Sequence, residues 1–75
     1  MNVEEKLKDY ILSRYNSLRE FSIRAEIPHS TFISILQRGI QNASVGNVIK
    51  ICRQLNISAD ELAEGKIVPR ERHKP

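Results

Sequence analysis

The chain has 75 residues, of which 40% are hydrophobic and 28% are charged, and its formal net charge is +3. A chain of this length supports one domain with one modest core and is too short to enclose a cofactor cleft as well, so we expect neither an enzyme nor a bound cofactor. The mixture of hydrophobic residues with charges of both signs is typical of a folded globular domain, not of a disordered chain.

Metal, disulfide and membrane chemistry have little support in the sequence. The single cysteine, Cys52, cannot form an internal disulfide and has no neighbouring cysteines to complete a usual zinc site. The other candidate ligands, His29 and His73, lie far from it along the chain, so no metal site is expected. No apolar run approaches the roughly 20 residues that span a bilayer, and none resembles a signal segment. We therefore expect a cytoplasmic protein without a membrane partner.

Two amphipathic segments open the chain. Residues 3–15 are predicted to form a helix that ends near Asn16, with its apolar side chains on one stripe. These apolar side chains are Val3, Leu7, Tyr10 and Ile11. A second helix begins at Ser17, whose hydroxyl can cap it while Glu20 reaches back to the Ser17 amide, as in a capping box. The residues expected to be buried by this helix are Leu18, Phe21, Ser22 and Ala25.

A third helix follows after a very short turn. Pro28 both ends the second helix and opens the third, because proline disfavours a helical conformation at the preceding Ile27 but fits a first helical turn. The inward face of the third helix is predicted to carry Phe32, Ile35 and Leu36. The outward face is predicted to carry His29, Ser30, Ile33, Ser34 and Gln37. Gly39 is expected to end the helix with a left-handed conformation.

Two further helices complete the predicted domain. Ser44 is expected to cap the fourth, whose apolar residues form the most regular core stripe of the chain. This stripe consists of Val45, Val48, Ile49, Cys52 and Leu55. Asn56 is expected to end the fourth helix, because asparagine tolerates a positive φ angle. Ser58 and Glu61 then form a second capping box, which opens a short fifth helix that contributes Leu62 to the core.

The predicted architecture is therefore all-α, with five compact helices over residues 1–66 and a basic, flexible tail over residues 67–75. The net positive charge lies mainly in the segment from Lys66 onward. Because this charge is not concentrated on the predicted helices, it argues only weakly for a nucleic-acid partner.

The second and third helices have the form of a helix-turn-helix, in which the second member exposes small polar side chains. Over Ser17 to Leu62 the sequence resembles the lambda repressor-like and Cro-like regulators, or XRE family, and particularly a branch found in Gram-positive bacteria and their prophages. The matching positions are Ser17, Phe21-Ser22, Ser30-Thr31-Phe32, Gly39 and Leu55-Asn56-Ile57-Ser58 through Leu62. Two departures stand out. Leu18 replaces a phosphate-binding Gln of many relatives, and Glu26 replaces the turn glycine, which costs about 1–2 kcal/mol if the turn is left-handed.

The resemblance implies a sequence-specific DNA-binding transcriptional regulator, expected to be a repressor that binds a palindromic operator as a homodimer through its third helix in the major groove. The positions that match base-reading residues are His29, Ser30, Thr31, Ile33 and Ser34. The residues expected to contact phosphate are Ser17, Arg19, Gln37, Arg38 and Asn42. The candidate dimer surface consists of Leu62, Ile67 and Val68. Because none of the base-reading side chains makes a strong bidentate pair, modest direct readout is expected.

A second interpretation is a protein-protein interaction module that kept this fold without DNA binding, such as an antitoxin-like or antirepressor-binding domain. Leu18 and Ile33, and the near-neutral charge of residues 17–42, favour it. Because the chain has no room for a ligand-sensing domain, an antirepressor or another partner protein is also a candidate regulator under the first interpretation. The two interpretations differ in whether the protein shows salt-dependent binding to duplex DNA.

Overall fold

The computed structural model describes residues 2–70. It contains the α-helices α1 (Val3–Leu12), α2 (Leu18–Arg24), α3 (His29–Arg38), α4 (Val45–Leu55) and α5 (Ala59–Ala63), with a short 3-10 helix η1 (Ile40–Asn42) between α3 and α4. The predicted all-α class with five helices is confirmed. Over the same residues, the β-type backbone pairing consists of one isolated antiparallel bridge between Ile57 and Pro69. No helix within residues 2–70 has the length and hydropathy needed to traverse a bilayer.

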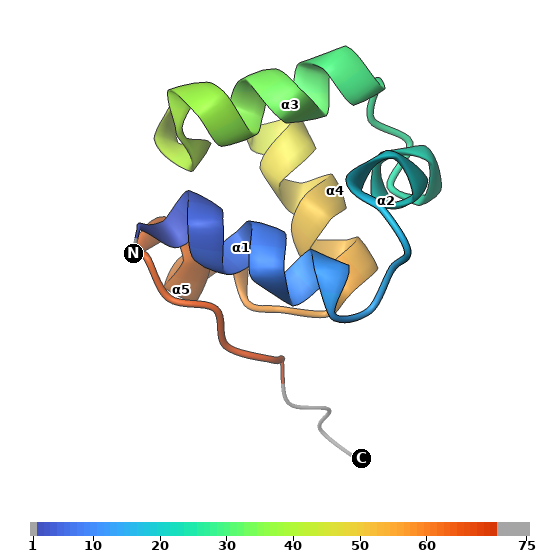
Figure 1. Ribbon diagram of the computed structural model, residues 1–75. Coiled ribbons are helices and arrows are strands. Elements are labelled where there is room, and N and C mark those ends of the chain that lie inside the picture. The colour runs from blue at the N-terminus through green and yellow to red at the C-terminus, as the bar shows by residue number, and fades with distance from the viewer. Residues whose placement is uncertain (1, 71–75) are drawn as a thin grey trace.

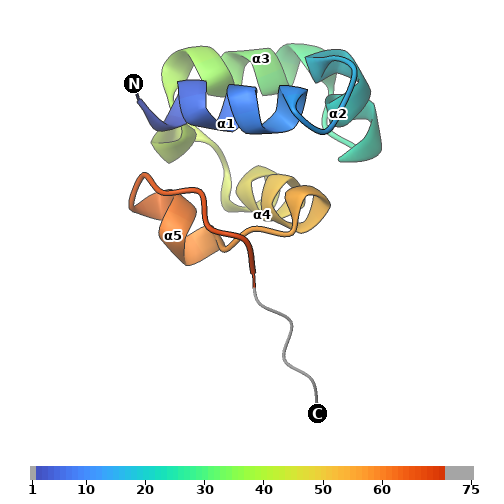
Figure 2. The same cartoon turned by 60° about the horizontal axis from the view of Figure 1, so that its bottom comes forward.

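The helices form two layers, with α1, α2 and α3 in one and α4 and α5 in the other (Figures 1 and 2). The core lies between them and draws fully buried side chains from every helix and from the connection after α4. The largest of these side chains belong to Phe21, Phe32, Leu7, Ile11, Ile51, Ile57 and Leu62. The rings of Phe21 on α2 and Phe32 on α3 lie 5.2 Å apart between centroids, so the two helices of the candidate helix-turn-helix share one aromatic contact.

Side-chain caps start the helices where the sequence predicts them. The hydroxyls of Ser17, Ser44 and Ser58 accept hydrogen bonds from the amides three residues later, at 3.0, 3.2 and 3.3 Å. At the other end of α4, Asn56 has φ 58° and ψ 47°, the left-handed conformation expected for it. These four positions confirm the predicted helix boundaries, because each cap satisfies backbone groups that the helix itself leaves unpaired.

Two local expectations at the start of the chain are wrong. Helix α1 ends at Leu12 instead of near Asn16. The hydroxyl of Ser13 donates a 2.6 Å hydrogen bond to the carbonyl of Tyr10, and such a side-chain bond to the backbone competes with continuation of the helix. The carboxylate of Glu20 accepts a 3.0 Å hydrogen bond from the amide of Asn16, not from that of Ser17. The second half of the predicted capping box is therefore shifted by one residue.

The core stripe of α4 is rotated from the predicted one. Val45 is 74% exposed and Ile49 is 40% exposed, whereas Ile51, which the predicted stripe omits, is buried. Cys52 and Leu55 are buried as expected. Helix α4 thus has more apolar surface than the rest of the domain covers, and the surplus lies on one side of it.

The turn between α2 and α3 places Glu26 at φ 61°, in the left-handed region that disfavours residues with a Cβ atom. Its carbonyl also accepts a 3.2 Å hydrogen bond from Nζ of Lys50. Because glycine relieves the strain and keeps that carbonyl, Glu26→Gly should raise the free energy of unfolding by about 1 kcal/mol and the thermal midpoint by roughly 4–8 °C. Thermal unfolding followed by circular dichroism measures both.

The matched control is Asp9→Gly, at an exposed position inside α1, which should lower the free energy of unfolding by about 0.5–1 kcal/mol because glycine costs more backbone entropy there. If Glu26→Gly lowers stability as Asp9→Gly does, the left-handed conformation is not a source of strain in this turn.

Ordered contacts extend beyond the predicted domain boundary at residue 66. The amide of Ser58 donates to the carbonyl of Val68, and the amide of Arg70 donates to the carbonyl of Asn56, both at 2.9 Å. Ile67 packs against the core at the same time. The predicted flexible tail over residues 67–75 therefore begins too early, because apolar packing and backbone pairing hold the chain through Arg70. Residues 71–75 lie outside the described residues.

Candidate nucleic-acid interface

The exposed face of α3 carries a row of polar side chains. Ser30, Ser34 and Gln37 are all exposed, and their i, i+4, i+7 spacing puts them on one stripe of the helix. The opposite face is fixed by Phe32 and Ile35, which are buried. Helix α3 runs along one edge of the molecule, and the other helices lie to one side of it (Figure 1). The polar row therefore faces solvent on a helix whose rotation is set by the core.

His29 stands at the first turn of α3 and is exposed, as expected. Its Nδ1 atom lies 3.5 Å from the hydroxyl oxygen of Ser22, which is fully buried and donates its proton to the carbonyl of Arg19 at 2.8 Å. Since that proton is already used, Nδ1 can approach Ser22 only as a donor. In a neutral ring this leaves Nε2 as an acceptor, and in a protonated ring as a donor.

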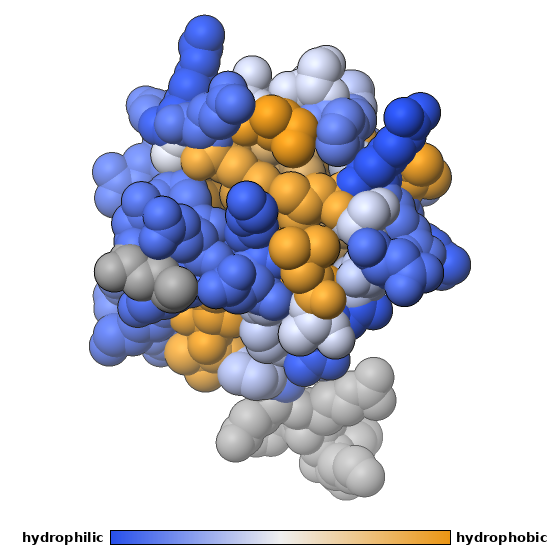
Figure 3. All heavy atoms as spheres, viewed as in Figure 1, coloured by the Kyte–Doolittle hydropathy of each residue, from blue (hydrophilic) through white to orange (hydrophobic). Residues whose placement is uncertain are grey.

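Two of the five predicted base-reading residues lie on the flanks of α3. Ile33 is half-buried and lines a shallow cavity with Leu18 and Leu36 on the side facing α1. Figure 3 shows apolar side chains reaching the surface between α3 and α1. Thr31 is also half-buried. The outward placement predicted for Ile33 is therefore only partly right, because Ile33 lies at the edge of the polar row, beside Ser30 and Gln37, and shares this cavity with Leu18 and Leu36.

The start of α2 carries two of the predicted phosphate contacts. The hydroxyl of Ser17 accepts from the Glu20 amide, which leaves its proton available for donation to a ligand. Arg19 is exposed. On the same helix, the guanidinium of Arg24 forms an ion pair with the carboxylate of Glu20 at 3.8 Å, and Arg19 is not part of it. Among the residues that the structure describes, the exposed guanidinium of Arg19 therefore forms no ion pair.

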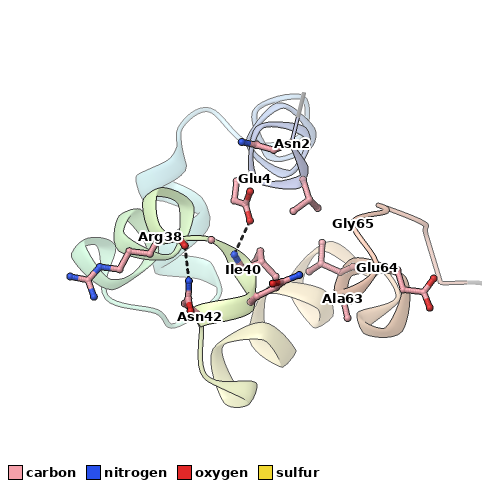
Figure 4. A pocket seen from close by; sticks show the side chains of 12 residues that line it. Asn2, Glu4, Arg38, Ile40, Asn42, Ala63, Glu64 and Gly65 are labelled. Atoms are coloured by element: carbon pink, nitrogen blue, oxygen red, sulfur yellow. Dashed lines mark hydrogen bonds between the residues drawn. The ribbon is translucent and has the colours of Figure 1, made fainter.

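The end of α3 carries the other predicted phosphate contacts. The side chain of Arg38 points away from the cavity beside it (Figure 4), whereas Nδ2 of Asn42 donates a 2.8 Å hydrogen bond to the Arg38 carbonyl. Asn42 therefore first serves to satisfy the end of the helix. Gly39 has the positive φ angle expected of it, 109°, but its ψ of 144° is extended and not left-handed helical. The expected αL cap is wrong in that respect, since the chain turns directly into η1.

The loop after α3 is tied to α1 by a contact that the sequence did not predict. Oε2 of Glu4 accepts a 2.8 Å hydrogen bond from the amide of Ile40, across 36 positions of sequence (Figure 4). A Cβ atom added at Gly39 would lie 3.6 Å from the same oxygen. Glu4 therefore fixes where the chain leaves α3. The sequence signals Glu4 only as an acidic residue in a first helical turn, which does not indicate its partner.

Removing this carboxylate with Glu4→Ala should lower the free energy of unfolding by about 1–3 kcal/mol, because the half-buried Ile40 amide loses its charged acceptor. Glu4→Gln keeps an acceptor oxygen and should cost less. Urea denaturation followed by circular dichroism measures the difference. Glu5→Ala is the control, since Glu5 is exposed on the next position, and an equal loss for Glu4→Ala and Glu5→Ala would contradict a role for the Ile40 contact.

Of the three residues predicted to form a dimer surface, one is exposed. Leu62 is 1% exposed and belongs to the core, so it cannot present a contact face, because α5 attaches to the domain through this side chain. Ile67 is half-buried and packs on the core. Val68 is 39% exposed. Of the three residues, Val68 alone offers substantial apolar surface.

Cys52 is a free cysteine. It is buried, and burial raises the pKa of its thiol, an effect that the positive charge of Arg70 partly opposes. The thiol therefore stays protonated at neutral pH and packs as a small apolar group. Within residues 2–70, no three His, Cys, Asp or Glu side chains come together in a way that could hold a metal ion.

Comparisons of the chain with protein-family models, with curated proteins and with solved structures found no match.

Proposed function

We propose that the protein is a sequence-specific DNA-binding transcriptional regulator of the lambda repressor-like type, with α3 entering the major groove. The observation that carries the proposal is the exposed row of Ser30, Ser34 and Gln37 on a helix at the edge of the domain. A major groove about 12 Å wide admits one helix, and short hydroxyl side chains let its backbone come close to the bases. Serine hydroxyls can donate or accept, so they suit several base edges.

Phosphate contacts would supply much of the affinity. Arg19 and Arg38 are exposed cations, at the start of α2 and at the end of α3. The first hydrogen bond within α3 runs from the Phe32 amide to the Pro28 carbonyl, so the amides of His29 and Ser30 precede it. Free amides at a helix start favour anionic groups. Such contacts fix position, while base edges and DNA shape give specificity.

The proposed regulator acts in the cytoplasm as a repressor that occupies a palindromic operator. Two copies would bind half-sites about 34–36 Å apart, because a single helix-turn-helix unit buries too little surface for tight binding. Its activity would be controlled by its concentration or by a partner protein such as an antirepressor.

The test is a titration of fluorescently labelled random-sequence duplex with the full chain, followed by anisotropy at several salt concentrations between about 50 and 200 mM. The logarithm of the association constant should fall linearly with the logarithm of the salt concentration, because each phosphate contact releases counterions. The proposal would be overturned if no binding is seen at the lowest salt concentration, or if the binding does not weaken as salt is added.

A second candidate function is a protein-protein interaction module. The apolar seam formed by Leu18, Ile33 and Leu36 beside the polar row favours it, since apolar side chains next to an exposed helix suit a protein partner. This function predicts no salt-dependent affinity for duplex DNA, so the same titration separates the two.

A further inference from the structure

Among the residues that the structure describes, Ser22 on α2 is the one buried polar residue. Its hydroxyl donates to the carbonyl of Arg19 at 2.8 Å, and the same oxygen lies 3.5 Å from Nδ1 of His29 at the start of α3. A hydroxyl has one proton, and here the shorter contact uses it. The oxygen keeps an unused lone pair, and solvent cannot supply a donor to it because Ser22 is fully buried. Nδ1 of His29 is in place to be that donor.

This contact determines which ring nitrogen of His29 carries the proton. A neutral imidazole has one N–H donor and one bare nitrogen that accepts. A bare Nδ1 would direct its lone pair at a lone pair of the Ser22 oxygen, whereas a protonated Nδ1 donates to that oxygen. The proton of the neutral ring therefore belongs on Nδ1, and Nε2 is an acceptor. Because the bond to the Arg19 carbonyl fixes the Ser22 hydroxyl, the ring is also oriented from this side.

Nε2 is the nitrogen of this ring that a ligand would meet. It is the ring nitrogen farther from the backbone, and His29 is exposed although its Nδ1 edge contacts a buried side chain. In a helix-turn-helix, residues at the start of the second helix contact base edges. An acceptor at that position can pair with an exocyclic amino group, N6 of adenine or N4 of cytosine. It has no proton to donate to O6 of guanine, to O4 of thymine or to a phosphate.

We propose that Ser22 is a positioning residue that holds His29 in its Nδ1-protonated form, so that His29 reads the amino group of adenine or cytosine in the major groove. The inference rests on the proposed function, because it names the base edge that the same site recognises. Ser22 is buried and acts on DNA only through the ring of His29. With the proton on Nε2 instead, the ring would donate and would favour the acceptors of guanine and thymine. One buried hydroxyl thus selects between two classes of base.

The first test observes the ring without DNA. Long-range proton–nitrogen correlation spectra of the isotopically labelled full chain, recorded at about pH 9 where imidazoles are neutral, distinguish a protonated ring nitrogen from a bare one. The signals of His29 are those that disappear in His29→Gln. The wild type should show a protonated Nδ1 and a bare Nε2. In Ser22→Ala the proton should move to Nε2, where a histidine in water mainly carries it. The variant should fold, since it loses one oxygen atom and alanine favours a helix.

Ser13→Ala is the matched control, because the hydroxyl of Ser13 also donates to the carbonyl three residues earlier, but at the end of α1. It removes the same group without changing the contact of His29, so its ring signals should match those of the wild type. A wild-type ring with its proton on Nε2 would overturn the proposal. So would a ring that Ser22→Ala leaves unchanged, or that Ser13→Ala changes to the same extent.

The second test selects bound duplexes from a randomised library with the full chain and with Ser22→Ala. For the wild type, one position of the half-site should favour adenine or cytosine by about fivefold, the lower end of the discrimination that a base-edge contact gives. With Ser22→Ala this position should change to guanine or thymine, and the same preference in both chains would overturn the assigned base edge. Failure of the proposed function is a different result, since it abolishes the salt-dependent binding of random duplex and this inference with it. A wrong ring form leaves that binding intact and overturns this inference alone.

Discussion

Ser34→Glu should weaken the binding of duplex DNA by about 100-fold or more, because a like-charge contact at an interface costs several kcal/mol. Ser34 lies in the middle of the exposed row on α3, between Ser30 and Gln37. If this row faces the floor of the major groove, a carboxylate there meets the negative potential of the phosphates on both strands. Anisotropy with labelled duplex at fixed low salt measures the change.

The control for Ser34→Glu is Ser13→Glu, which changes the net charge by the same amount at an exposed position just after α1. It should alter affinity by less than about threefold, through the overall field of the protein alone. Circular dichroism on both variants verifies that the helices are intact. Equal affinity for the two variants would mean that the row on α3 is not the DNA-binding face.

Phe32→Ala should lower the free energy of unfolding by about 3–5 kcal/mol, the usual loss when a buried aromatic side chain is truncated. Phe32 is fully buried on the inner face of α3 and contacts the ring of Phe21. A domain of this length is stabilised by roughly 4–11 kcal/mol in total, so the variant should be partly unfolded near 37 °C. Urea denaturation at low temperature, extrapolated to zero denaturant, measures the loss.

Phe32→Leu should cost less than Phe32→Ala, because it keeps most of the apolar volume and leaves a smaller cavity. Ile23→Ala serves as the surface control, at a 66% exposed position, and should change stability by less than about 0.5 kcal/mol. A loss below about 1 kcal/mol for Phe32→Ala would contradict a core that anchors α3, since large losses are expected wherever a buried ring leaves a cavity.

The predictions that hold depend on chemistry between residues close in sequence. The caps at Ser17, Ser44 and Ser58 are confirmed because a hydroxyl and the amide three residues later meet whenever a helix starts there. The left-handed conformation of Asn56 at the end of α4 is also a local property, because asparagine tolerates a positive φ angle. The left-handed turn at Glu26 could be expected only from the resemblance to regulators that carry glycine there.

The predictions that fail concern which apolar side chains the neighbouring helices cover. Periodicity places Val45 and Ile49 on the apolar side of α4 but does not show how far the neighbouring helices extend over it. Leu62 is predicted both as a core residue of the fifth helix and as part of a dimer surface, and its burial confirms the first prediction and contradicts the second.

For the candidate site, the sequence indicated the polar face of α3 but not what holds it in place. Ser30, Ser34 and Gln37 share a stripe that helical spacing alone reveals. The bond from the Ile40 amide to Glu4 joins residues 36 positions apart, so no local pattern could predict it. The half-burial of Ile33 likewise depends on Leu18 and on α1.

The pairing of Val68 and Arg70 with the connection after α4 has a practical consequence for measurements on this protein. It holds the last described residues on the side of the molecule opposite α3, as both ribbon views show. A biotin or fluorophore attached beyond Arg70 would therefore tether the protein to a sensor chip with the serine row directed toward the flowing solution. The same handle would stand well clear of an oligonucleotide, so it should report affinity without obstructing it.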